Sequence, residues 1–224
     1  MENLPSYIPI IFELTTLLTI LFFYEASNKS KVALLILLTW IMVQALISNT
    51  GFYTVTDTLP PRFLLLVFPP LVTIVLLFTL LKGRFFINHL DIKLLTLLHV
   101  VRIPVELVLY WLFIYKQVPG LMTFEGRNFD ILAGLSAPVI YYWGYVKQKI
   151  SQRIILVWNI VCLVLLLNIV VNAVLSTPVS FQQFAFDQPN VAILYFPFIW
   201  LPGCIVPLVL FSHLVVIKRI LKSK

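Results

Sequence analysis

Residues Ile154–Leu175 read IILVWNIVCLVLLLNIVVNAVL, a run in which no side chain is charged. An α-helix rises about 1.5 Å per residue, so about 20 mostly apolar residues cross the ~30 Å hydrocarbon core of a bilayer. This run is long enough to do so. It therefore predicts a transmembrane helix, and the rest of the chain repeats the pattern.

Seven apolar runs of this kind occupy most of the chain. The protein has 224 residues, of which 61% are hydrophobic and 11% charged, whereas a soluble domain is about 45–50% apolar and about 25% charged. We therefore expect an all-α membrane protein, a seven-transmembrane-helix bundle that forms one domain over residues 1–224. The fifth run is short and contains Gly134 and Pro138, so we expect it to be tilted or kinked. The runs are Ile8–Tyr24, Val32–Ser48, Phe63–Leu81, Leu94–Tyr115, Phe129–Val146, Ile154–Leu175 and Val191–Ile217.

The basic residues indicate how the bundle is oriented. With the N-terminus outside and the C-terminus in the cytoplasm, twelve of the 16 lysines and arginines lie in cytoplasmic segments, as the positive-inside rule requires. The outer loops then hold Arg62, Lys116 and Arg127, and Arg102 lies within a helix. This topology accounts for the net charge of +7, so we expect no nucleic-acid partner. The twelve are Lys29, Lys31, Lys82, Arg84, Lys93, Lys147, Lys149, Arg153, Lys218, Arg219, Lys222 and Lys224.

The fourth run carries a stripe of ionisable residues. His99, Arg102 and Glu106 are three and four positions apart, which places them on one face of a helix. Ionisable groups inside a bilayer are costly and tend to face the interior of a bundle. The stripe is either an ion pair of Arg102 with Glu106 that holds helices together, or part of a site that handles a ligand or ion. A carboxylate or amide of another helix is expected near Arg102, with Glu13 and Asn168 as candidates.

Further polar residues fall in the outer half of the predicted bundle. Glu13, Gln44, Asn168 and Asn172 are of this kind, and hydrogen bonds between helices are the alternative explanation for the three amides. The segment Phe124–Asp130, with the sequence FEGRNFD, precedes the fifth helix. Its residues Asn128 and Asp130 suit a helix N-terminus. We expect its polar side chains, Glu125 and Arg127 included, to pack inward over the mouth of the bundle.

These residues together predict a polar pocket open to the outside. The candidate ligand-binding residues are Glu13, Gln44, His99, Arg102, Glu106, Arg127, Asp130, Asn168 and Asn172. Cys162 and Cys204 lie in apolar runs and are interpreted as small buried hydrophobic residues. His89 and His213 are interpreted as interfacial. No metal-ligand spacing or cofactor motif is present, so neither a metal nor a cofactor is expected.

The predicted topology and the Phe124–Asp130 segment resemble small uncharacterised bacterial multi-pass membrane proteins. That resemblance carries no activity, and the compact loops favour the bacterial inner membrane. The pocket favours a small-molecule transporter or sensor, whose partners are the bilayer and a small-molecule or lipid ligand. One alternative is an intramembrane enzyme acting on a lipid or another apolar substrate, with Glu106 or Asp130 as acid or base and Arg102 or Arg127 holding an anionic group. Another alternative is an accessory subunit without a ligand.

Overall fold

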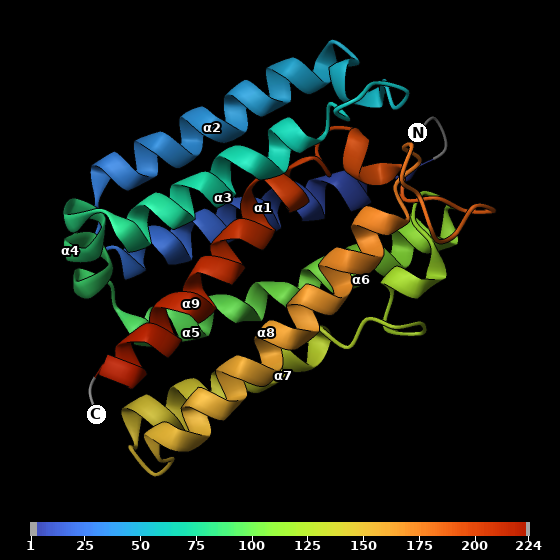
Figure 1. Cartoon of the computed structure of the whole chain (residues 1–224). Helices are drawn as coiled ribbons and strands as arrows, with labels where there is room; N and C mark the ends of the chain where they lie inside the picture. Colours follow the sequence, from blue (N-terminus) through green and yellow to red (C-terminus); the bar gives the residue numbers. More distant parts are fainter. Residues whose placement is uncertain (1–3, 223–224) are drawn as a thin grey trace.

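The computed structural model describes residues 4–222, and within them every regular element is helical. Five segments of this part are long and apolar enough to cross a membrane. The prediction of an all-helical chain with several such helices is confirmed. Lys224, one of the basic residues counted above, lies outside the described residues. The five segments are α1 (Tyr7–Ala26), α2 (Lys31–Asn49), α5–α6 (Ile92–Ile114), α8 (Gln152–Leu175) and the Leu201–Lys222 segment that ends in α9 (Figure 1).

A sixth crossing is formed only if α3 (Leu64–Thr79) and α4 (Leu81–His89) are counted together, and they meet at an angle of 91°. At the bend the two helices come very close, because a Cβ added to Gly83 would lie 2.5 Å from the Cα of Leu77. The predicted third run thus ends where α3 ends. The chain then turns sideways into α4, which carries Lys82 and Arg84.

The predicted fifth span, Phe129–Val146, is helical from Ile131 onward but is short. Helix α7 (Ile131–Val139) continues as a π-helix, Ile140–Val146, and the whole Ile131–Val146 segment is shorter than a full crossing. The residues before it form an irregular segment that is described below. The helix lengths therefore support five or six crossings within residues 4–222, and the seventh depends on this segment.

The predicted start of the seventh helix is wrong by ten residues. The regular segment begins at Leu201 as a π-helical turn, Leu201–Ile205, and continues as α9 (Val206–Lys222). Before it, Ala192–Leu194 forms a short 3₁₀ turn. Pro197 explains the difference, because proline disfavours helical geometry in the residue before it and lacks an N–H group.

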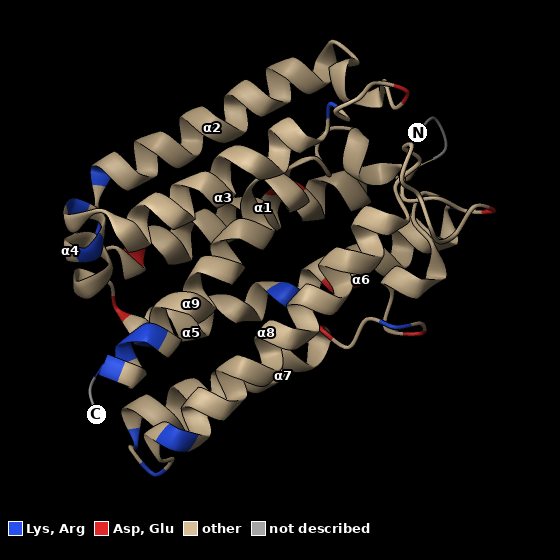
Figure 2. Cartoon of the chain, viewed as in Figure 1, with Lys and Arg blue, Asp and Glu red and all other residues tan. Residues whose placement is uncertain are grey.

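Lysine and arginine residues gather at the end of the bundle that holds α4, the α7–α8 loop and the C-terminal part of α9 (Figure 2). We call it the basic end. Hydrogen bonds to backbone carbonyls join its elements. Arg219 donates from Nη1 to the Asn88 carbonyl at 2.6 Å, and Asn28 donates from Nδ2 to the His89 carbonyl at 2.6 Å. The three long connections 50–63, 115–130 and 176–200 lie at the opposite end, the loop end (Figure 1).

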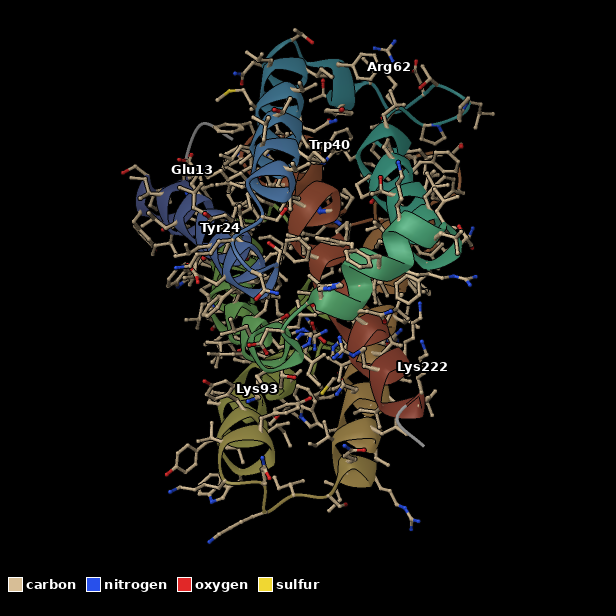
Figure 3. All side chains as sticks on the ribbon, turned by 90° about the vertical axis from the view of Figure 1, so that its left-hand side faces the viewer. Glu13, Tyr24, Trp40, Arg62, Lys93 and Lys222 are labelled. Atoms are coloured by element: carbon tan, nitrogen blue, oxygen red, sulfur yellow. The ribbon has the colours of Figure 1, made fainter. Side chains whose placement is uncertain are left out.

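Helix α2 lies at the periphery of the bundle. Its side chains Val32 and Leu35 are 69% and 67% exposed, as lipid-facing residues would be. Two tryptophans attach it to the segment before α9. Trp40 points from α2 towards that segment and donates from Nε1 to the Gly203 carbonyl at 2.7 Å, and Trp200 donates to the Ile41 carbonyl at 3.0 Å (Figure 3).

Candidate functional site

The ionisable stripe of the fourth run is buried near the middle of the Ile92–Ile114 segment. His99, Arg102 and Glu106 are at most 2% exposed. The 3₁₀ turn His99–Val101 joins α5 (Ile92–Leu98) to α6 (Arg102–Ile114). It places His99 one turn before Arg102. All three therefore face protein, as the spacing predicted.

The partner of Arg102 is Asp130, which lies at the start of α7. Arg102 Nε is 3.3 Å from Asp130 Oδ2, and both side chains are almost fully buried. The two predicted partners do not contact Arg102 in this way. Glu13 is partly exposed on α1 (Figure 3), and Asn168 is exposed and donates from Nδ2 to the Arg127 carbonyl at 2.8 Å.

Asn128 links Glu106, the second buried carboxyl residue, to the segment that carries Asp130. Its Nδ2 donates to Glu106 Oε1 at 2.6 Å and to the Met122 carbonyl at 3.0 Å, and its Oδ1 accepts from the backbone N–H of Asp130 at 3.0 Å. We expected Asn128 to cap the fifth helix, but α7 begins only at Ile131. Asn128 instead orients Glu106 and Asp130 relative to each other.

The segment Thr123–Asp130 is irregular backbone packed against α6, and its polar residues divide into two groups. Asn128 and Asp130 point inward, whereas Glu125 and Arg127 are exposed. The prediction that all four pack inward is therefore wrong for the latter pair. Phe124 holds the segment by stacking on Tyr110, with ring centroids 4.9 Å apart.

Gly126 permits this fold, because a Cβ there would lie 2.3 Å from the Gly120 carbonyl oxygen. Gly134 has a similar role one helical turn into α7, where a Cβ would lie 2.9 Å from Ile103 Cγ1 and 3.3 Å from Arg102 Cβ. The two glycines let the backbone carry Asp130 close to Arg102.

A pair of histidines extends the buried polar cluster towards the basic end. The rings of His99 and His213 stack with centroids 3.9 Å apart and an interplanar angle of 16°. Both residues are fully buried, and His213 donates from Nδ1 to Asn159 Oδ1 at 3.0 Å. The interfacial interpretation of His213 is wrong because α5, α8 and α9 enclose it. Asn159 was not among the predicted site residues, although an amide within a charge-free apolar run was a usable signal.

Two remaining predicted residues have local partners. Gln44, near the end of α2, accepts a hydrogen bond from the Tyr53 hydroxyl, and burial raises the pKa of Tyr53 to about 12. Asn172 donates from Nδ2 to the Asn168 carbonyl at 3.0 Å, one turn earlier in α8. The bond of Gln44 joins two neighbouring elements, whereas the bond of Asn172 lies within α8 and is not the bond between helices that was the alternative explanation for the amides.

A cavity of about 230 Å³ lies beside the cluster, between α3, α6, α8 and α9. We call it the carboxyl cavity, because Glu106 and Asp130 supply its charged lining and the other lining residues are apolar. Two of these, Leu71 and Leu167, are also 38% and 49% exposed at the surface of the bundle. The cavity therefore extends from the buried carboxyl groups to the side of the bundle.

A second cavity, of about 490 Å³, lies between α2, α3 and α9. We call it the apolar cavity. Trp40, Pro69 and Phe211 contribute to its wall, and none of the described residues that line it is charged.

A comparison with known protein families finds a match over most of the chain. Residues 59–221 match a family model described as Domain of unknown function (DUF8737). The chain belongs to the DUF8737 family. No curated protein and no solved structure matches it. The DUF8737 region contains the whole lining of the carboxyl cavity, whereas α1 and α2, which contribute to the apolar cavity, precede it.

The charges of the cluster formed by Arg102, Glu106 and Asp130 do not balance by themselves. Arg102, Glu106 and Asp130 are at least 95% buried, and arginine stays protonated in proteins. With both carboxyl groups ionised the three would carry a net charge of −1. Glu106 Oε2 and Asp130 Oδ1 also lack hydrogen-bond partners. Since an unbalanced buried charge is very costly, one further positive charge is needed to balance the cluster. A proton on a carboxyl group, a proton on the buried neighbour His99 or a bound cation would each supply it.

Proposed function

We propose that this protein binds a small molecule in the carboxyl cavity and acts as a membrane transporter or sensor. The observation that carries the proposal is the position of two incompletely paired, buried carboxyl groups in the wall of a cavity inside a helical bundle. A concave, mostly apolar pocket with a few converging polar groups is the usual form of a small-molecule site. An accessory subunit that used these residues only to hold helices together would have no need of a cavity beside them.

The bends around the cavity are consistent with a site that opens and closes. Pro202 and Pro207 lie in the segment that forms one wall of the cavity, where the backbone changes from π-helical to α-helical geometry. Prolines are tolerated in membrane helices where neighbouring groups satisfy the freed carbonyls, often beside a cavity. Movement of this segment relative to α3 would change access to Glu106 and Asp130.

Native mass spectrometry of the protein purified in a mild detergent tests ligand binding. We expect a non-covalent small-molecule adduct on the wild type. Ala173→Trp, which places a large ring in the carboxyl cavity, should lose the adduct. Val171→Trp is the matched control, because Val171 lies on the same helix and is 53% exposed on the outer face.

Val170→Phe is a second cavity-filling variant in case Ala173→Trp does not fold, and thermal unfolding of each variant shows that it is folded. The proposal predicts adduct loss in both cavity-filling variants and retention in Val171→Trp. Equal adduct levels in folded samples of all four proteins, or no adduct in any, would contradict ligand binding in this cavity.

For the topology, we propose seven crossings with the N-terminus outside and the C-terminus in the cytoplasm of a bacterial inner membrane. The clustering of basic residues at one end supports this orientation (Figure 2). The seventh crossing would consist of Ile131–Val146 together with the Thr123–Asp130 segment. Irregular backbone at membrane depth is tolerated where it is buried in protein, and Thr123, Asn128 and Asp130 are buried. The exposed Glu125 and Arg127 would then lie at the outer membrane–water interface.

Labelling of single cysteines with a membrane-impermeant maleimide tests the topology. Cysteines at Thr56 and Gln183 should react from outside in intact cells. Cysteines at Asn88 and Lys149 should react only after the membrane is opened. The native Cys162 and Cys204 are buried and should give little background. Labelling of Asn88 and Lys149 positions in intact cells would reverse the proposed orientation.

A further inference from the structure

The charge and shape of the carboxyl cavity indicate which class of molecule it takes. We infer that the ligand is an amphipathic organic cation, which enters from the lipid and replaces the proton held by Glu106 or Asp130. The inference rests on the proposed function, because it concerns the same cavity. Four observations carry it, namely the charge of the cluster, the free carboxyl oxygens, the apolar lining and the opening towards the side of the bundle.

The charge of the cluster favours a cation over an anion. Arg102 is paired with Asp130 and does not line the cavity, so the charged groups that a ligand meets there are carboxyl groups. Asp130 Oδ1 and Glu106 Oε2 are the oxygens without a partner. An ammonium group would donate hydrogen bonds to both oxygens and would bring the net charge of the cluster to zero. As it binds, the proton that one carboxyl group carried passes to water.

The apolar lining excludes a bare metal ion as the preferred occupant. Calcium takes six to eight oxygen ligands and magnesium about six, but the cavity supplies charged oxygens from two residues, and its other walls are apolar side chains such as Leu109, Val170 and Leu210. A ligand with an ammonium head and an apolar body satisfies both parts of the lining.

The position of the opening favours entry from the lipid. At the loop end, the Thr123–Asp130 segment covers the cluster. Its Asn128 donates a hydrogen bond to the Met122 carbonyl, and its Arg127 carbonyl accepts one from Asn168. At the side, cavity residues Leu71 and Leu167 on α3 and α8 are exposed. An amphipathic amine concentrates in a bilayer with its tail among the acyl chains, so it would meet the cavity from this side.

The test uses dicyclohexylcarbodiimide, an apolar reagent that reacts with carboxyl groups only in their protonated form. Protein in lipid nanodiscs at neutral pH is labelled, digested and examined by mass spectrometry. We expect labelling of Glu106 or Asp130 in the wild type. In Glu106→Gln and in Asp130→Asn a single carboxyl group remains, and its ionised form balances the charge of Arg102. Because only the protonated form reacts, labelling of that remaining group should fall at least tenfold relative to the wild type. Unchanged labelling of the remaining carboxyl group in both variants would show that the two do not share a proton, and would overturn the inference.

The ligand class is tested by protection with three molecules that share one tail. Octylamine, which is protonated at neutral pH, should slow the total modification of the carboxyl group at least tenfold, counted as carbodiimide adduct plus the octylamide that forms when the amine attacks an activated carboxyl group, whereas octanol and octanoate should change it less than twofold. Ala173→Trp, with the cavity filled, should show no protection by octylamine. Glu13, a partly exposed acidic residue on α1, is the internal control, and its labelling should not depend on octylamine.

The outcomes separate this inference from the proposed function. Equal protection by octanol and octylamine would overturn the cation and leave small-molecule binding in place. Stronger protection by octanoate would assign the ligand to Arg102 and would also overturn it. Protection by none of the three overturns the inference, and the native mass spectra then decide by themselves whether the cavity binds a molecule at all.

Discussion

The apolar cavity and the carboxyl cavity differ in a way that size alone does not predict. The apolar cavity is the larger, about 490 Å³ against about 230 Å³, yet no charged side chain belongs to its described lining. The carboxyl cavity is smaller and contains Glu106 and Asp130. The apolar cavity also uses residues of α1 and α2, which precede the DUF8737 region, whereas the carboxyl cavity lies entirely within that region.

This difference shows why volume is a poor guide to function inside a membrane. An apolar crevice that faces lipid can be filled by any acyl chain, so it needs no specific ligand. A cavity that keeps carboxyl groups away from water bears an electrostatic cost, because charged groups within spanning helices are expensive. Ligand binding, as proposed above, would give a reason for placing carboxyl groups there at that cost.

The largest expected effect comes from removing the charge behind the carboxyl cavity. Arg102→Met leaves two buried carboxyl groups without a counter-charge, and we expect the free energy of unfolding to fall by about 3–5 kcal/mol. Denaturant-induced unfolding in detergent micelles measures it. Adding Glu106→Gln and Asp130→Asn to the same chain should restore most of the loss. A decrease under about 1 kcal/mol for Arg102→Met alone would mean that the cluster is hydrated and is not the buried network described above.

A smaller effect on stability is expected when a glycine near each cavity is replaced by alanine. A Cβ at Gly134 would lie 2.9 Å from Ile103 Cγ1 and 3.1 Å from the Ile103 nitrogen, whereas a Cβ at Gly203 would meet nothing closer than 3.7 Å. Gly134→Ala should therefore destabilise the protein by about 1–3 kcal/mol through overpacking and separate Asp130 from Arg102. Gly203→Ala, its matched control, should cost under about 0.5 kcal/mol. Thermal unfolding of both variants checks this, and equal costs would show that α6 and α7 are not tightly packed at Gly134.

The smallest expected effect belongs to the apolar cavity. Trp40→Phe removes the hydrogen bond to the Gly203 carbonyl, which should cost about 1 kcal/mol of stability. Because Trp40 does not contact the carboxyl cavity, carbodiimide labelling of Glu106 and Asp130 should stay within twofold of the wild type. A large loss of labelling in this variant would mean that the two cavities are coupled and that the comparison between them is too simple.

Sequence patterns predicted the parts of this structure that depend on periodicity within one element. The apolar runs located the long helices to within a few residues, and the spacing of His99, Arg102 and Glu106 placed them on one buried face. The start of the last helix was missed because a run of apolar residues does not distinguish the Ala192–Leu194 turn from a helix.

The partners across the cluster could not be predicted in the same way. Asp130 was interpreted as a residue of a helix N-terminus, and His213 as interfacial, since both interpretations follow from local position. Their actual contacts with Arg102 and His99 depend on how α7 and α9 pack against α5–α6. Close approach at Gly134 and burial of α9 decide this packing, and neither leaves a periodic pattern in one sequence.

An experimental density map of the protein in lipid nanodiscs tests the central claim most directly. We expect the apolar cavity to contain elongated density typical of an acyl chain. The carboxyl cavity should instead contain compact density within hydrogen-bonding distance of Glu106 Oε2 or Asp130 Oδ1, which disappears in Ala173→Trp. A carboxyl cavity that is filled only by acyl-chain density, or that is closed by contact of Glu106 with Arg102, would contradict the claim that these carboxyl groups bind a ligand.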